Sequence, residues 1–322
     1  MEPVEILGVL SSLTPDAYFQ SSMSGQLPRY AFFHKALCGF KREIASTSAS
    51  SEEEYGAKVR KRRKKMKRLK ELLRDRGRRL ARMTALDLGA GFGIEALLWR
   101  GMGGGSVIAL DRQPCALDPN CRDQMRQWMA AVHASIEEPF DPAQDVRAVF
   151  RQKGVEWLVA DAASVPVDDE SLDLVFSISS LEHIGDIERA ISEVHRLLKP
   201  GGIFYAEWSN FYSLVGAHSP GIVDIPWGHV LLTPDELRTL SCELNSVSED
   251  EFDALVGGLN RWHLRRWRET FDDSLWKVHE WKHLADEGVE PLIPLWLIDR
   301  LPRELTIVDL VTDDIRALLE KR

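Results

Sequence analysis

Hydrophobic positions follow two different periods along this chain of 322 residues. From residue 84 onward, short apolar runs alternate with amphipathic segments, which is typical of a parallel sheet with helices on both faces. The pattern predicts strands at 84–89, 106–111, 155–161, 172–179 and 202–209. The clearest helix begins at Asp186, because six apolar residues share one face before Pro200 and two glycines end the segment.

The connection between the second and third predicted strands is unusually long. It places 49 residues between Asp111 and Asp161, more than one helix with short loops requires. We therefore expect an additional helix at 121–136. Further along the chain, we expect a helix that carries Trp262 and Trp267, whose rings are more often core than substrate platform.

A strongly basic segment precedes the first strand. Residues 58–82 contain 15 Lys or Arg against two acidic residues, a local charge of +13 in a chain of net charge −9. Five apolar residues recur there on one helical stripe, namely Val59, Met66, Leu69, Leu73 and Leu80. The segment reads as an amphipathic helix whose basic residues are solvated, although such a block can also bind nucleic acid, an acidic membrane surface or an anionic substrate. Before it, the polar stretch 45–54 is expected to be a flexible link.

Composition indicates a soluble enzyme. The chain is 44% hydrophobic, contains no apolar run of the roughly 20 residues that a bilayer crossing needs, and begins without the basic region of a secretory signal. We therefore expect a cytoplasmic protein without a membrane partner. Its cysteines, Cys38, Cys115, Cys121 and Cys242, match no common zinc spacing, and we expect reduced thiols and no bound metal.

A glycine-rich loop follows the first predicted strand in the sequence TALDLGAGFGIEALL, residues 84–98. A strand that ends in such a loop and opens a helix brings backbone N–H groups close to a ligand. The dinucleotide-binding pattern requires a sixth-position glycine, where Ile94 stands, and a P-loop requires a Lys that is absent. Instead, Asp87 and the three glycines 89, 91 and 93 are spaced by two.

This acid-x-Gly-x-Gly-x-Gly sequence resembles motif I of the class I S-adenosylmethionine-dependent methyltransferases. The resemblance covers about residues 84–210, and the segment "LEH", residues 181–183, makes it closest to the small-molecule type. It implies a Rossmann-like, doubly wound, seven-stranded, mostly parallel α/β sheet with an antiparallel last strand. The last two strands would then lie near 274–281 and 315–322. Segments 1–82, 83–212 and 213–322 would form an N-terminal extension, the cofactor-binding core, and a substrate loop with a helical cap.

The same resemblance implies which residues contact S-adenosylmethionine. Asp87 would face the ammonium of the methionine end, Asp111 would take the ribose hydroxyls, and Asp161 with its neighbour would meet the adenine. The full expected set is Asp87, Gly89, Ala90, Gly91, Gly93, Asp111, Arg112, Asp161, Ala162 and Ser177.

Candidate proton acceptors lie after the fifth predicted strand. His218, Asp224 and His229 stand in a Gly- and Pro-rich segment of the kind that binds acceptors at this sheet edge. A neutral imidazole can remove the proton of an alcohol or phenol as the methyl group arrives, and Asp224 can orient the ring. Both histidines can equally satisfy loop carbonyls. His195, off the apolar stripe of its helix, is expected at the surface.

Three functions are compatible with these patterns. The leading hypothesis is methyl transfer to a small molecule, with oxygen as the expected acceptor atom. An alternative is a nucleic-acid or protein methyltransferase that docks through the basic helix, although "SISSLEH" stands where a base-methylating motif of the Asn-Pro-Pro-aromatic type would lie. The third is a non-catalytic protein that binds the cofactor.

Overall fold

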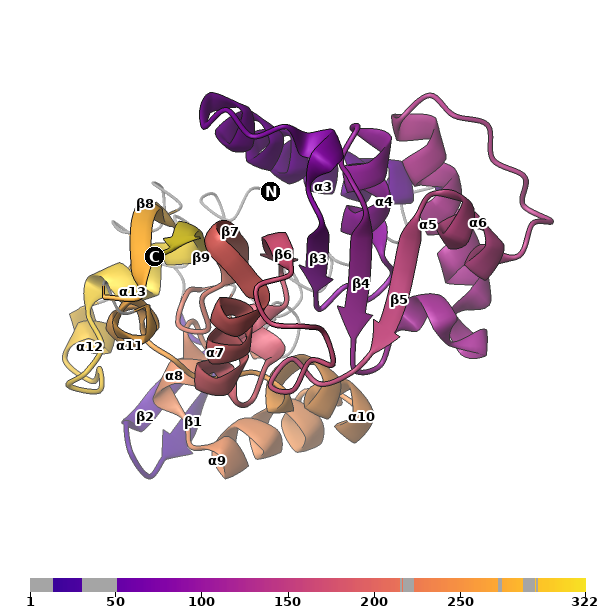
Figure 1. Ribbon diagram of the computed structural model, residues 1–322. Helices are drawn as coiled ribbons and strands as arrows, with labels where there is room; N and C mark the ends of the chain where they lie inside the picture. Colours follow the sequence, from indigo (N-terminus) through magenta and orange to yellow (C-terminus); the bar gives the residue numbers. More distant parts are fainter. Residues whose placement is uncertain are drawn as a thin grey trace. The chain divides into compact units, whose positions relative to one another are not determined.

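The computed structural model describes residues 14–30, 51–214, 216, 223–271, 274–285, 293 and 295–322. Seven of its strands form one sheet in the order β5, β4, β3, β6, β7, β9, β8, and β1 pairs with β2 in a separate hairpin (Figure 1). The strands are β1 (Ala17–Ser21), β2 (Gly25–Arg29), β3 (Ala85–Leu88), β4 (Val107–Asp111), β5 (Val155–Val159), β6 (Leu172–Ile178), β7 (Leu198–Ser209), β8 (Trp276–Ala285) and β9 (Thr312–Lys321).

Strand directions follow from the register. Strands β3 to β7 pair in parallel, with Ala85 opposite both Val107 and Leu174. Strand β9 runs the other way, since the N–H of Asn210 donates to the carbonyl of Asp313 at 2.8 Å just after β7. On the other side of β9, the N–H of Arg322 donates to the carbonyl of Leu275, just before β8, at 3.0 Å. The predicted mostly parallel sheet with an antiparallel last strand is confirmed.

Helices connect the parallel strands and fill the segment after β7. They are α3 (Ser51–Asp75), α4 (Ile94–Gly101), α5 (Arg122–Ser135), α6 (Val146–Gln152), α7 (Ile187–Leu197), α8 (Gly228–Leu231), α9 (Pro234–Arg238), α10 (Glu249–Phe252), α11 (Leu264–Thr270), α12 (Leu295–Ile298) and α13 (Ile307–Val311). The additional helix expected at 121–136 is α5. The segment between β7 and β8 is helical as expected, and its role as a cap stays a prediction.

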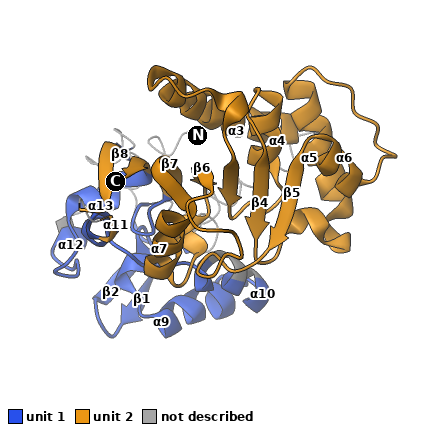
Figure 2. Ribbon diagram, in the orientation of Figure 1, with its two compact units in different colours: residues 1–47, 209–269, 282–315 blue, residues 48–208, 270–281, 316–322 orange. Residues whose placement is uncertain are grey.

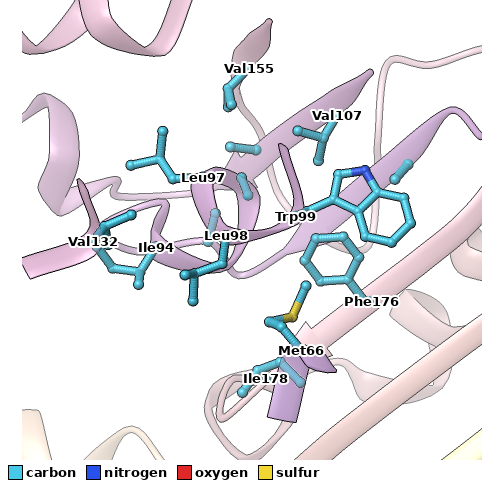
Figure 3. Close-up of a cluster of buried hydrophobic side chains, with 14 of the residues drawn as sticks. Met66, Ile94, Leu97, Leu98, Trp99, Val107, Val132, Val155, Phe176 and Ile178 are labelled. Carbon is cyan, nitrogen blue, oxygen red and sulfur yellow. The ribbon is translucent and has the colours of Figure 1, made fainter. Parts of the chain in front are cut away.

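The basic helix α3 contributes to the main hydrophobic core. Its apolar stripe is buried, with Val59, Leu69 and Leu73 fully covered. Met66 points toward Phe176 and Ile178 of β6 (Figure 3). Helix α3 also packs against α4 and α5. The stripe read from the sequence is therefore the face that closes the core.

The chain divides into two compact units (Figure 2). The larger comprises residues 48–208, 270–281 and 316–322 and contains the core to which α3 belongs. The smaller comprises the described parts of 1–47, 209–269 and 282–315. It has its own apolar cluster, in which Leu27 of the hairpin joins Trp227 and Leu237. This division differs from the predicted segments, because α3 belongs with the strands and the hairpin with the residues after β7.

Two local expectations need correction. His195 is half-buried, with its ring centre 5.1 Å from that of Trp276 in an edge-on contact, and burial lowers its pKa. It is thus a packing residue and not a surface one, because β8 covers the helix flank on which it lies. The predicted flexible link 45–54 also ends early, since α3 begins at Ser51, and residues 45–50 lie outside the described part.

The packing of α3 predicts a difference between its two faces. Replacing fully buried Leu69 with Ala should lower the free energy of unfolding by about 2–5 kcal/mol, since it leaves a cavity in the core. Replacing exposed Lys67 with Ala should change it by no more than about 0.5 kcal/mol. Urea unfolding followed by circular dichroism measures both. Equal effects would mean that α3 is not part of the cooperative core.

Candidate functional site

The glycine loop lies at the carboxyl end of β3, between β4 and β6. The N–H groups of Gly89 and Ala90 both donate to the carbonyl of Leu110 at 2.9 Å. The N–H of Gly91 donates to Oδ2 of Asp111 at 2.8 Å. Three loop amides are therefore used to fix the loop itself, so that it is shaped before any ligand arrives.

Gly89 is required by both its conformation and its surroundings. Its φ of +77° lies in the left-handed region, and a Cβ there would stand 2.4 Å from the Cβ of Ser180. The Ser180 hydroxyl in turn donates to the Gly89 carbonyl at 2.9 Å. Ser180 was not among the predicted site residues, although it stands next to the "LEH" segment that carried the resemblance. It holds the end of β6 against the loop.

Two carboxylates at neighbouring strand ends remain accessible. Asp111 is partly exposed at the end of β4, where Oδ1 accepts from the N–H of Gln113 at 2.8 Å. Asp161, two residues beyond β5, is exposed, and its Oδ1 accepts from the N–H of Ala163 at 2.8 Å. Each oxygen keeps a lone pair for a ligand hydroxyl or amine. The two neighbours expected in the set are accessible as well, Arg112 being exposed and Ala162 partly exposed.

Asp87 is enclosed beneath the loop. Its side chain is buried, and Oδ2 accepts from the N–H of Ala96 at 3.1 Å in the first turn of α4. Burial and the nearby Glu95 raise its pKa, while Arg62 of α3 acts in the opposite direction. Arg62 forms an ion pair with Glu95. The enclosed carboxylate supports the loop from beneath, and its contact with the cofactor ammonium stays a prediction.

Two further members of the expected set are also enclosed. The Ser177 side chain is fully buried, and its hydroxyl donates to the carbonyl of Leu88 at 2.9 Å. Ala90 is 5% exposed. Ser177 therefore ties β6 to β3, and its place in the cofactor-binding set stays a prediction.

The residues at this edge fit S-adenosylmethionine. The space in front of Gly91 is open, since a Cβ there would meet nothing within 4 Å. The carboxylate of Asp111 stands beside that space and is bonded to Gly91 itself, which suits a ribose diol. Ligands of open α/β sheets bind at such carboxyl ends. When bound, the cofactor would supply an electrophilic methyl group, and the loop with the two accessible carboxylates, Asp111 and Asp161, would hold it.

Comparison with known proteins agrees with this geometry. A family model described as "Methyltransferase domain" matches residues 140–206, which include β5, β6, α7 and most of β7. The seven-stranded sheet with its antiparallel strand β9 is the architecture that the resemblance implies. Over residues 140–206 the chain is thus similar to the methyltransferase-domain family, and its sheet is that expected for the class I S-adenosylmethionine-dependent type.

Several proteins are similar to parts of this chain. The ubiquinone/menaquinone biosynthesis C-methyltransferase of Acidiphilium cryptum is 31% identical over 122 residues, which cover 38% of this chain and 40% of that protein. The malonyl-[acyl-carrier protein] O-methyltransferase of Serratia marcescens is 30% identical over 139 residues, covering 41% and 43%. An S-adenosylmethionine-dependent methyltransferase structure from Mesorhizobium loti has a TM-score of 0.43 and 17% identity, covering 75% and 92%. The chain thus spans less than half the length of these two sequence relatives.

The predicted proton acceptors lie in the smaller unit or outside the described residues. His218 is among the latter. The carboxylate of Asp224 binds Arg29, with Nη2 2.8 Å and Nε 3.0 Å from Oδ2. Its described contacts therefore do not orient His229. Nη2 of Arg29 also donates to Oδ1 of Asn245 at 3.1 Å, which further holds the guanidinium against Asp224.

His229 is enclosed within the smaller unit. Its side chain is 3% exposed, and its ring lies 5.3 Å from that of Phe211. The carbonyls of Phe211 and Ser213 approach the ring and raise its pKa, but neither forms a well-aligned hydrogen bond with a ring nitrogen. Burial outweighs them and lowers the pKa to about 4. The imidazole is thus neutral at pH 7 and a weak base.

Other chemistry has less support among the described residues. No group of three or more His, Cys, Asp or Glu side chains there is placed to bind a metal ion. The thiols of Cys115, Cys121 and Cys242 are free, and Cys38 lies outside the described residues. No helix in this part of the chain combines the length and hydropathy that a membrane span needs.

The methyltransferase loop should fail when Gly89 gains a side chain. Gly89→Ala should lower affinity for S-adenosylhomocysteine at least about tenfold, because the new methyl group displaces Ser180 from the loop. Gly77→Ala is the matched control: its φ is +70° and nothing lies within 4 Å, so only about 1 kcal/mol of backbone strain is expected. Calorimetric titration and thermal unfolding measure the two effects. Adding Ser180→Gly to Gly89→Ala should recover part of the affinity, and no recovery would contradict the contact.

Buried His229 predicts an acid-sensitive stability. Its pKa is about 4 in the folded chain against 6.5 for an unperturbed histidine, so the unfolded chain binds the proton more readily. The resulting stability is complete above pH 6.5 and is lost as pH falls toward 4, by about 3 kcal/mol in total. His229→Gln should flatten this part of the profile. Urea unfolding at several pH values tests the prediction, which fails if both proteins show the same slope.

Proposed function

We propose that the protein transfers a methyl group from S-adenosylmethionine to a small-molecule acceptor. The observation that carries the proposal is the pairing of Gly91 with Asp111 at an open strand edge, in a sheet whose strands β5, β6 and most of β7 lie in the segment 140–206 that matches the methyltransferase family. Methyl transfer from a sulfonium is an in-line displacement, so the protein mainly positions two reactants and removes water from between them. It requires little covalent machinery, which suits a site built from backbone amides and carboxylates.

A small-molecule acceptor is supported by the relatives. One of the two described above is named for methylation at carbon in quinone biosynthesis, and the other for methylation at oxygen of a malonyl group on a carrier protein. Oxygen as the acceptor atom here stays a prediction. Of the two candidate bases, buried His229 with a pKa of about 4 is a weak proton acceptor, and His218 stays the candidate for an acceptor that must lose a proton.

One observation keeps nucleic acid as a second candidate acceptor. On and just after α3, seven basic side chains are exposed and make no ion pair with another described residue: Arg60, Lys61, Lys64, Lys67, Arg74, Arg79 and Arg82. Such a row can contact phosphates. A mobility-shift titration at increasing salt distinguishes the two candidates, since phosphate contacts give a steep salt dependence. Turnover of any acceptor would exclude a non-catalytic role.

The cofactor role of Asp111 gives the direct test. Asp111→Ala should weaken binding of S-adenosylmethionine and S-adenosylhomocysteine at least about tenfold, because it removes both the ribose partner and the hydrogen bond that fixes Gly91. Asp118→Ala is the control: this exposed aspartate caps the N–H of Asn120 at 2.8 Å in the following loop. Calorimetry gives the affinities, and an acceptor screen that detects S-adenosylhomocysteine gives turnover. Unchanged affinity in Asp111→Ala would refute the assignment.

A further inference from the structure

A cationic and aromatic cluster lies in the smaller unit, directly after β7. Phe211 and Tyr212 follow the strand by two and three residues. The guanidinium carbon of Arg261 lies 5.2 Å from the centre of the Phe211 ring. The Tyr212 hydroxyl donates to the carbonyl of Arg261 at 2.8 Å. Two segments distant in the sequence are thereby joined, and the cation is held over an aromatic face.

The strand end that presents these residues is rigid. The Asn210 side chain is fully buried, and its Nδ2 donates to the carbonyls of Asp309 at 2.7 Å and Thr312 at 2.9 Å. Phe211 is itself 4% exposed and packs on Tyr212 and on His229. The ring beneath Arg261 therefore cannot move aside, and it limits the conformations open to the guanidinium.

Arg261 is a cation without a described carboxylate partner. Three other arginines of this unit have one: Arg29 pairs with Asp224, Arg238 with Glu249 and Arg265 with Glu269. Arg261 forms no ion pair with a described residue, and burial lowers its pKa while Tyr212 acts in the opposite direction. Its side chain is nevertheless exposed enough for a ligand to reach it. A partly desolvated, accessible and uncompensated guanidinium is a receptive site for an anion.

Two cationic and two acidic side chains act on the Tyr212 hydroxyl of this cluster. Arg266 lies 3.9 Å above the Trp262 ring and, like Arg261, lowers the pKa of the Tyr212 hydroxyl. Burial dominates that pKa and raises it to about 12, with Glu304 and Asp309 acting in the same direction. Asp309 is already engaged, accepting from the N–H of Leu264 at 2.9 Å and from Thr306. The acidic groups in reach thus act on Tyr212 and leave Arg261 available.

We propose that Arg261, held over Phe211 and fixed by Tyr212, binds a carboxylate or phosphate group of a small-molecule ligand. The fork of a guanidinium matches two oxygens of either group, whereas a lysine would act as a point charge. The inference concerns the smaller unit alone and makes Arg261 an anion-binding residue of that unit.

The test uses the full-length protein saturated with S-adenosylhomocysteine. Benzoate with benzamide, and phenyl phosphate with phenol, are titrated while tryptophan fluorescence is recorded. Wild type should bind one anionic member at least about tenfold more tightly than its neutral analogue, and the preferred pair identifies carboxylate or phosphate. Arg261→Gln should lose that preference. Arg265→Gln should keep it, because Arg265 is an exposed arginine of the same segment, 3.7 Å from Glu269.

A chemical readout separates this inference from the proposed function. Phenylglyoxal labels accessible arginines, and peptide mass spectrometry should show that the preferred anion protects Arg261 but not Arg265. Binding of S-adenosylhomocysteine to Arg261→Gln should equal that to wild type. Failure of wild type to bind the cofactor product would refute the proposed function alone. The anion site would be refuted if wild type showed no preference for the anions over their neutral analogues at millimolar concentration. It would also be refuted if Arg261→Gln and Arg265→Gln lost that preference equally.

Discussion

The methyltransferase site depends on the neutralisation of two carboxylates beneath its glycine loop. Asp87 and Glu95 are 1% and 3% exposed, at the end of β3 and the start of α4. Two buried like charges repel, and Glu95 raises the pKa of Asp87 accordingly. Arg62 supplies the compensating charge from α3, and its own pKa is raised by Glu95. Removing one member of such a group leaves a buried charge uncompensated, which commonly costs about 3–5 kcal/mol.

A second ion cluster fastens α3 at another point of the same unit. Glu207 near the end of β7 lies 2.9 Å from Arg316 of β9 and 3.3 Å from Lys65 of α3. Burial favours protonation of Glu207, but Lys65, a hydrogen bond from Tyr205 and Arg316 outweigh it and lower the pKa. The basic composition of α3 thus has an internal use. Two of its cations satisfy acids of the sheet and of α4, while its apolar stripe closes the core between them.

The sequence was sufficient for features that depend on local periodicity. The strands from β3 to β7 and the helices α5 and α7 lie within a few residues of their expected positions, because each carries its own apolar pattern. The role of Asp87 could not be read in the same way. An acid before a glycine loop has the same sequence whether it faces a ligand or caps the next helix. That Asp87 is buried and accepts from the N–H of Ala96 is visible only in the structure.

Partners distant in the sequence account for the remaining differences. Arg29 and Asp224 are separated by 195 positions, and no local pattern indicates that one would occupy the other's carboxylate. For His229 a signal was present, since Trp227, Val230 and Leu231 surround it in the sequence and all are buried. A histidine within an apolar run is more often enclosed than catalytic. Loop composition rich in Gly and Pro obscured that signal.

The two units differ in which charge lacks a described partner. In the larger unit every buried carboxylate discussed above receives a cation or a backbone N–H, so these anions support the fold. In the smaller unit Arg261 lies over Phe211 and forms no ion pair with a described acid. The proposed cofactor offers hydroxyls and amines to accessible carboxylates such as Asp111 and Asp161, whereas a guanidinium without a described acid favours an anion. The two proposed sites therefore favour ligand groups of opposite character.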